Sequence, residues 1–374
     1  MRGALPDYPW DAMAPYAAEA AQHPEGALNL SIGSPVDPTP GSVREALAAA
    51  TDAHAYPATA GTPALREAIA EWFLRRRGVT VAPDNVLPTV GSKELVALLP
   101  FLLGIGAGEA VVFPRIAYPS YAIGAALVGA DEIASDDPAE WPDNTRLVWI
   151  NSPSNPDGRV QDVDRLRAAV ARARELGAVI AGDECYAEFG WDAPWDARPI
   201  PSILDPEVVG DDHTGVLSVY SLSKQSNLAG YRAAFLAGDP ELVARLLTVR
   251  KHAGLMQPAP VQAAMVAALR DETHVDEQRA RYRARRDLLR PALEAAGFRI
   301  EGSEAGLYLW ATRGTDAWDA VSSLAKLGIV VGPGHFYGDH SPQHVRLALT
   351  ASDADVAAAA ARIQASAQAH GIRK

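Results

Sequence analysis

The stretch GVLSVYSLSKQSNLAGYR, residues 215–232, has the pattern of a buried strand that runs into a lysine. Residues 216–220 are mostly strand formers and carry no charge, yet Lys224 follows them closely. Burying an unpaired ammonium group costs far more than a hydrogen bond returns. A lysine at the end of such a strand therefore indicates a functional position, and the rest of the chain indicates what surrounds it.

Similar apolar strands recur along the chain and alternate with helical segments. Strands are predicted at residues 85–90, 109–114, 145–150, 178–184 and 215–221. Helices are predicted at residues 62–77, 92–103, 118–129, 161–176, 239–250 and 258–270. Strands rich in Val, Ile and Leu that alternate with helices predict an α/β fold, with a mostly parallel sheet sandwiched by helices.

The pattern changes after residue 272. A long charged helix is predicted near 275–296, followed by short strands and two more helices, which indicates a smaller α+β domain. Residues 1–41 are rich in proline and glycine, and their SIGSPVDPTP segment is predicted to be loop or extended chain. We therefore expect an N-terminal arm (1–41) that is part of the small domain, a large domain (42–280) and a small C-terminal domain (281–374).

Composition excludes several classes of function. Of the 374 residues 48% are hydrophobic and 21% charged, which is ordinary for a soluble protein. The formal net charge of −12 argues against nucleic-acid binding and gives no support for binding an anionic membrane. The longest apolar run, residues 95–108, contains Pro100 and is too short to span a bilayer. The first residues do not resemble a secretory signal, so we expect a cytoplasmic protein.

Two apparent binding motifs and the lone cysteine give little evidence for a dinucleotide, metal or disulfide site. Cys185 is the only cysteine, which excludes a disulfide framework or a multi-cysteine metal site and suggests a reducing compartment. The GIGAG motif at 104–108 lies between a helix and a strand, the wrong context for a dinucleotide loop. His335, His340 and His344 have loose metal-like spacing, but no regular helix can span their segment. We predict no metal site.

Polar and aromatic residues follow the predicted strands, where the carboxyl ends of a parallel sheet form a ligand site. Ser92 and Lys93 begin a helix, whose free N–H groups attract an anion. The later strands are followed by an aromatic ring, an amide, a carboxylate, a phenol and the lysine: Tyr118, Asn155, Asp183, Tyr186 and Lys224. Pyridoxal 5′-phosphate has a phosphate, a flat ring, a ring nitrogen, a phenolic oxygen and an aldehyde that would use all of these groups.

The motifs GSKE, NSPSNPDG, DECY, SLSK…GYR and VRLAL together resemble the fold-type I, class I/II aminotransferases, with the same order and spacing across essentially the whole chain. The resemblance implies that Lys224 forms the Schiff base with the cofactor and then shuttles the proton. It also implies that Asp183 holds the ring nitrogen protonated, that Asn155 and Tyr186 contact the phenolic oxygen, and that Tyr118 stacks on the ring.

The same resemblance implies the remaining contacts. Arg346 binds the substrate α-carboxylate, with Asn155, and Gly33 lets the backbone approach it. Tyr56 reaches the phosphate in a neighbouring subunit, which implies a homodimer with shared active sites. The phosphate cradle is implied to comprise Ser92, Lys93, Ser221, Ser223 and Arg232.

The sequence SLSKQSNLAGYRAAF, together with AYPSY and the short N-terminal arm, is most similar to the actinobacterial succinyldiaminopimelate transaminases of lysine biosynthesis. That resemblance implies amino transfer between glutamate/2-oxoglutarate and N-succinyl-2-amino-6-oxopimelate. The distal carboxylate of such substrates needs a cation or donors. The partner-subunit arginine that fills this role in the aspartate aminotransferase pattern has no evident counterpart here, and the candidates are Arg250, Lys251 and His252, with Arg115 as another.

Other functions fit the same motifs. An aspartate or broad-specificity aminotransferase would share all of these residues, and so would a pyridoxal-phosphate-dependent carbon–sulfur β-lyase. A non-catalytic regulator built on an aminotransferase-like domain is an alternative from a different class, but it would need a fused DNA-binding module.

Overall fold

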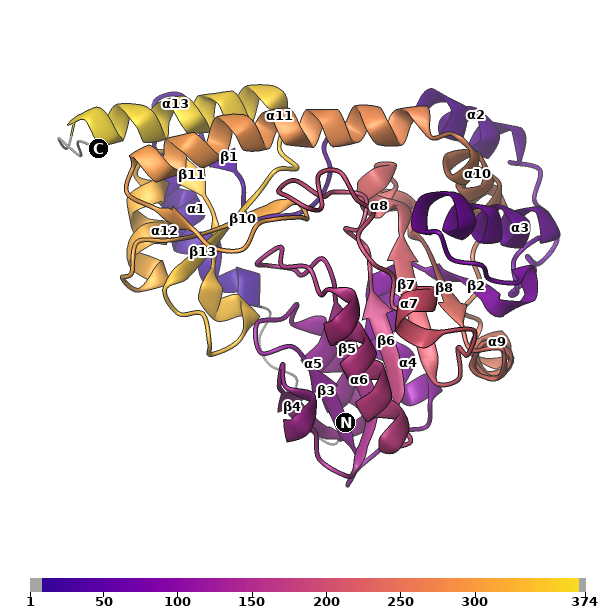
Figure 1. Cartoon of the computed structure of the whole chain (residues 1–374). Coiled ribbons are helices and arrows are strands. Elements are labelled where there is room, and N and C mark those ends of the chain that lie inside the picture. The colour runs from indigo at the N-terminus through magenta and orange to yellow at the C-terminus, as the bar shows by residue number, and fades with distance from the viewer. Residues whose placement is uncertain (1–8, 370–374) are drawn as a thin grey trace.

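The structure is a computed structural model that describes residues 9–369. Its large domain is built on a seven-stranded sheet with the strand order β2-β8-β7-β6-β5-β3-β4, in which only β8 runs antiparallel to its neighbours (Figure 1). The strands are β2 (Val86–Val90), β3 (Ala110–Phe113), β4 (Asp131–Ala134), β5 (Thr145–Asn151), β6 (Val179–Asp183), β7 (Val216–Ser221) and β8 (Ala233–Gly238). The predicted α/β fold is confirmed.

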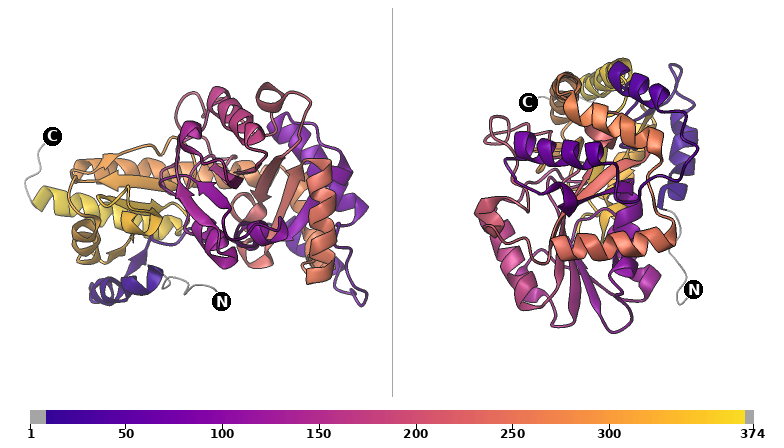
Figure 2. Two further views of the ribbon diagram at one scale, coloured as in Figure 1. Left: turned by 90° about the horizontal axis from the view of Figure 1, so that it is seen from below. Right: turned by 90° about the vertical axis from the view of Figure 1, so that its right-hand side faces the viewer.

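Helices cover both faces of this sheet because its central strands are apolar on both sides (Figure 2, right). Within β5, Leu147 and Trp149 pack into one apolar cluster and Val148 into the other. The first face carries α4 (Ser92–Leu102), α5 (Ser120–Val128) and α9 (Pro240–Ala253). The second carries α3 (Pro63–Trp72), α6 (Val163–Glu175), α7 (Pro206–Val209) and α10 (Ala259–Arg270), with α2 (Gly41–Ala49) packed on α10.

Local sequence explains several boundaries. The Thr62 hydroxyl accepts a hydrogen bond from the Leu65 N–H at 3.2 Å and caps α3, with proline at the first helical position as predicted. The strands β4 and β8 and the helix α2 were not predicted. β4 is a charged edge strand, DEIA, and β8 is alanine-rich, so neither has the Val/Ile/Leu signature that the prediction relied on.

The small domain contains a four-stranded antiparallel sheet, β12-β13-β10-β9, and a two-stranded parallel sheet, β1-β11. Its strands are β1 (Leu28–Asn29), β9 (Arg299–Ile300), β10 (Tyr308–Thr312), β11 (Ile329–Val330), β12 (Gly332–Pro333) and β13 (His344–Ala348). Its helices are α1 (Ala14–Ala20), α12 (Ala317–Ala325) and α13 (Asp353–Ala369). In Figure 2 (left), the indigo α1 lies beside the yellow C-terminal segments, and Tyr16 stacks on Trp318 at 5.2 Å.

The helix α11 (Thr273–Ala295) connects the two domains and runs across the top of Figure 1. Near its start, Gln278 accepts a hydrogen bond from Asn227 of the large domain at 3.0 Å. Near its end, Leu289 and Leu293 belong to the apolar cluster of the small domain. The helix therefore crosses the expected boundary at residue 280 without a break, and the division at 41 and 280 stays a prediction.

Candidate active site

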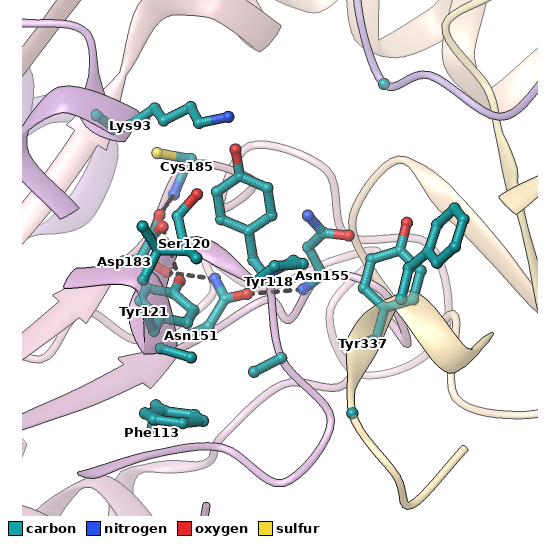
Figure 3. Close-up of a pocket in the computed structure, with 18 of the residues that line it drawn as sticks. Lys93, Phe113, Tyr118, Ser120, Tyr121, Asn151, Asn155, Asp183, Cys185 and Tyr337 are labelled. Atoms are coloured by element: carbon teal, nitrogen blue, oxygen red, sulfur yellow. Dashed lines mark hydrogen bonds between the residues drawn. The ribbon is translucent and has the colours of Figure 1, made fainter. Parts of the chain in front are cut away.

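A cavity of about 980 Å³ lies where the carboxyl ends of the parallel strands face the small domain (Figure 3). Of the residues predicted to contact the cofactor or the α-carboxylate, all except Tyr56 line it: Gly33, Ser92, Lys93, Tyr118, Asn155, Asp183, Tyr186, Ser221, Ser223, Lys224, Arg232 and Arg346. The sheet topology explains this convergence, because strands far apart in sequence end at one edge.

Lys224 lies on the one-turn helix α8 (Leu222–Gln225), which begins where β7 ends. The Ser221 hydroxyl caps this turn by accepting the Ser223 N–H at 3.2 Å. The ammonium group of Lys224 reaches across to the N-terminal arm, where it donates a hydrogen bond to the Gly33 carbonyl. The lysine therefore points into the cavity rather than into bulk solvent.

A group of donors surrounds the start of α4. Gly91, with φ 83° and ψ 153°, precedes the helix, and a Cβ placed there would lie 2.2 Å from an Nη atom of Arg232. Ser221 and Ser223, whose hydroxyls are 2.8 Å apart, also line this cavity. Hydroxyls, a guanidinium group and the first N–H groups of an eleven-residue helix form a cradle suited to a phosphate dianion.

Asp183 ends β6 as a buried carboxylate. One oxygen accepts the Tyr121 hydroxyl at 2.9 Å and the other accepts the Cys185 N–H at 3.2 Å (Figure 3). Burial raises the pKa of Asp183, while the Cys185 and Tyr121 hydrogen bonds and the charge of Lys224 act in the opposite direction. A cationic group placed against this carboxylate would stabilise its charged form.

Asn155 and Arg346 meet deeper in the cavity. The side-chain amide oxygen of Asn155 accepts a hydrogen bond from Arg346 Nη1 at 2.8 Å. The backbone N–H of Asn155 donates to Asn151 Oδ1 at 2.7 Å. Arg346 Nη2 donates to the Ser31 carbonyl at 2.6 Å. The guanidinium group also lies 4.0 Å from the ring centre of Tyr308, within the range of a cation–π contact.

Two tyrosines from different domains face each other at this point. The hydroxyls of Tyr186 and Tyr308 lie 3.1 Å apart, and both side chains are buried. A Cβ at Gly33 would lie 2.0 Å from the Tyr308 hydroxyl oxygen. Glycine is therefore required at position 33 by close approach to Tyr308.

The arrangement of these groups agrees with what comparison with known proteins finds. The model of the family "Aminotransferase class I and II" matches residues 25–363. The chain belongs to this aminotransferase family.

Several known proteins are similar over nearly the whole chain. The chain is 58% identical over 360 residues to the 4-dedimethylamino-4-oxo-anhydrotetracycline transaminase OxyQ of Streptomyces rimosus, covering 96% of this chain and 99% of that protein. It is 53% identical over 361 residues to the probable aminotransferase Rv1178 of Mycobacterium tuberculosis, covering 96% and 85%. The crystal structure of an aminotransferase from Neisseria meningitidis superimposes with a TM-score of 0.87 at 33% identity, covering 97% and 98%.

This family uses pyridoxal 5′-phosphate, and the residues of the aminotransferase fit it. The cradle at Gly91 and Arg232 matches the phosphate, and the buried Asp183 carboxylate matches a protonated ring nitrogen. Lys224, on the same cavity wall, supplies the amine that the aldehyde needs. None of the helices in residues 9–369 combines the length and apolarity needed to cross a bilayer. Over the same residues, no three His, Cys, Asp or Glu side chains could together hold a metal ion.

Four of the expected residues lie outside the cavity: Tyr56, Arg250, and the exposed Lys251 and His252 in the last turn of α9. The prediction that Arg250 binds the distal carboxylate is wrong, because its side chain is fully buried and donates two hydrogen bonds to Glu94, at 2.9 and 3.0 Å. Arg115 does line the cavity, where it pairs with Glu140 at 2.6 Å. Tyr56 is 96% exposed and outside the cavity, so its role at a partner subunit's site stays a prediction.

Sequence reasoning missed several residues of the site. Tyr121 lies three positions after Tyr118, inside the quoted motif AYPSY, and on the predicted helix 118–129 this spacing places the two tyrosines one turn apart on the same face, so the sequence did contain a signal for it. Tyr308 and Tyr337 come from the small domain, where neither belongs to a recognised motif. Only the tertiary structure brings them to Arg346.

Proposed function

We propose that this aminotransferase transfers the amino group of glutamate to N-succinyl-2-amino-6-oxopimelate, the reaction of a succinyldiaminopimelate transaminase. The observation that supports amino transfer is that Lys224 and Arg346, 122 positions apart, line one cavity of about 980 Å³, while the succinylated acceptor is inferred from the sequence resemblance described above. The lysine supplies the reacting amine and the arginine binds the carboxylate beside the reacting carbon. The keto acid has such a carboxylate and a long substituted chain beyond it.

Pyridoxal phosphate, when bound, would supply an aldehyde for the substrate amine and a ring that delocalises the electron pair left at the substrate Cα. In the proposed mechanism, Arg346 and Asn155 orient the α-carboxylate, so that the Cα–H bond faces Lys224. The amine of Lys224 would take the proton from the substrate Cα and return it to the carbon that was the cofactor's aldehyde carbon, on the other side of the amine nitrogen. Asp183 would keep the ring nitrogen protonated, and Tyr118 would stack on the ring.

The distal part of the substrate would lie along the rim of the cavity. Arg115 and His340 line it; Arg115 is paired with Glu140 and would have to share its guanidinium group with a second carboxylate, to which His340 adds a further donor. Relatives about 32% identical, such as that of Dehalococcoides mccartyi, are named LL-diaminopimelate aminotransferases, and that substrate also has two carboxylates on a seven-carbon chain. The composition of the rim and these relatives support a long polar acceptor.

A second candidate acceptor is a large polycyclic ketone. The name of the relative from Streptomyces rimosus specifies a 4-oxo-anhydrotetracycline substrate. The same cavity also has apolar lining, including Trp10, Phe113, Ile123 and Phe336, which would favour fused rings. This acceptor would not need the cationic rim that a second carboxylate requires.

A panel of half-reactions tests the proposal. The holoenzyme is first converted to its amino form with glutamate. The succinylated keto acid, 2-oxoglutarate, oxaloacetate and the 4-oxo-anhydrotetracycline are then added separately, while the absorbance of the bound cofactor is followed. We expect the succinylated keto acid to restore the starting spectrum with the highest kcat/KM. Higher kcat/KM with oxaloacetate or with the polycyclic ketone would refute the assignment, and release of pyruvate and ammonia from cystathionine without any acceptor would establish a β-lyase.

A further inference from the structure

Tyr337 has a buried hydroxyl that the roles above do not use. It ends the short helix Gly334–Tyr337 and lines the cavity on the small-domain side, across from Tyr118 (Figure 3). Its side chain is 1% exposed, and within residues 9–369 its hydroxyl has no hydrogen-bond partner. Buried hydroxyls are nearly always paired, because an unpaired one loses the hydrogen bonds it would make to water. The missing partner at a cavity wall points to a ligand.

The ring is held where it is from several sides. It packs edge-on against Trp310, with ring centres 5.7 Å apart, and against Trp10 at 6.5 Å. The backbone carbonyl of Tyr337 accepts the Ala117 N–H at 3.0 Å, which ties the segment to the large domain. Burial raises the pKa of the hydroxyl, against the opposing charge of Arg346, so the group is a neutral hydrogen-bond donor at physiological pH.

Arg346 is a neighbour of the Tyr337 ring. The guanidinium carbon lies 5.0 Å from the Tyr337 ring centre. Both terminal nitrogens of Arg346 already donate to Asn155 and Ser31, while Nε is buried without a partner in the described part of the chain. Two neighbouring side chains therefore each hold an unpaired buried donor. An oxyanion with several lone pairs can accept from both.

We propose that the Tyr337 hydroxyl donates a hydrogen bond to the substrate carboxylate that Arg346 binds. Tyr337 is thus a binding residue that selects amino acids and keto acids with a carboxylate next to the reacting carbon. The inference rests on the proposed function only in that Arg346 binds this carboxylate; it does not depend on which acceptor is the natural one.

Glutamate and 4-aminobutyrate form a matched pair of donors for the test. The second compound lacks the α-carboxylate and keeps the distal one. Single-turnover half-reactions of wild-type and Tyr337→Phe holoenzyme are followed by the cofactor absorbance. We expect Tyr337→Phe to raise KM for glutamate about tenfold, as loss of one hydrogen bond to a charged group predicts, with kcat unchanged. The kinetics with 4-aminobutyrate should be the same in both proteins.

Tyr282→Phe is the control variant, because Tyr282 has a fully buried hydroxyl outside the cavity. It should leave KM for glutamate unchanged. The apo form of Tyr337→Phe should unfold at the same Tm as wild type or higher, since the hydroxyl it removes has no partner in the protein.

Three results would overturn the inference: an unchanged KM for glutamate, an equal effect on 4-aminobutyrate, or a lowered Tm of the apo variant. Absence of any wild-type reaction with glutamate would instead refute the proposed function, so the two failures are distinguishable.

Discussion

Replacing Gly91 by alanine should weaken cofactor binding far more than it weakens the fold. The backbone at Gly91, φ 83° and ψ 153°, lies in a region that is essentially restricted to glycine, so alanine costs about 1–3 kcal/mol of folding free energy. The new Cβ would also lie 2.2 Å from an Nη atom of Arg232. Since Arg232 is an exposed, flexible side chain, the guanidinium group moves aside and the fold survives.

The displaced guanidinium group of Arg232 is the one assigned to the phosphate, so the substitution should lower the affinity for the cofactor. Losing one charge-assisted hydrogen bond of about 1.5–3 kcal/mol corresponds to a rise in Kd of roughly 10- to 150-fold. Gly108→Ala is the matched control: its φ is 84°, but a Cβ there meets no atom within 4 Å. Kd is measured by titrating the apo form with pyridoxal phosphate and following absorbance, and Tm by thermal unfolding. Equal Kd values for the two variants would refute the assignment of Arg232 to the phosphate.

Three further changes test other parts of the site. Lys224→Ala should lower amino transfer at least about a thousandfold, as loss of a proton-transfer group does, and normal turnover would contradict its assignment. Tyr121→Phe removes a donor that lowers the already raised pKa of Asp183. That pKa should therefore rise further, and activity should be lost at a higher pH on acidification; an unshifted acid limb in the pH profile of kcat/KM would argue against this coupling. Glu94→Gln leaves the buried Arg250 without its charged partner and should lower the free energy of unfolding by about 3 kcal/mol in urea denaturation, whereas an unchanged value would show that the pair is not stabilising.

The part of the site that was predictable from sequence belongs to the parallel sheet. Asp183 directly ends β6, and Lys224 follows β7 by three residues. Strand periodicity locates both, and the parallel topology requires their carboxyl ends to meet. No contact had to be known in advance, because local sequence fixes where each strand ends and the sheet then fixes which ends are neighbours.

The small-domain half of the site had no comparable local rule. Arg346 lies inside a strand, and its partner Ser31 is 315 positions away in the N-terminal arm, at a bend just after β1. Tyr308 lies on β10, two residues before Trp310, which pairs with Arg346 on the adjacent strand β13. No sequence motif indicates that these two strands are neighbours. The error at Arg250 has the same origin. A charged helix end suggests that Arg250 is a solvent-exposed cation. In the structure Arg250 is instead buried and paired with Glu94, which lies 156 positions earlier in the sequence.

The N-terminal arm explains how these two halves act as one site. The Ser31 carbonyl accepts from Arg346, the Ile32 carbonyl accepts from Thr350 at 3.0 Å, and the Gly33 carbonyl accepts from Lys224. Three successive carbonyls thus join the small-domain arginine to the large-domain lysine. A Lys224 amine held by the cofactor would no longer donate to Gly33, so the arm would lose its contact with the large domain at that point while keeping its contacts with Arg346 and Thr350 of the small domain. Binding at Lys224 and binding at Arg346 therefore act on the same short segment of backbone.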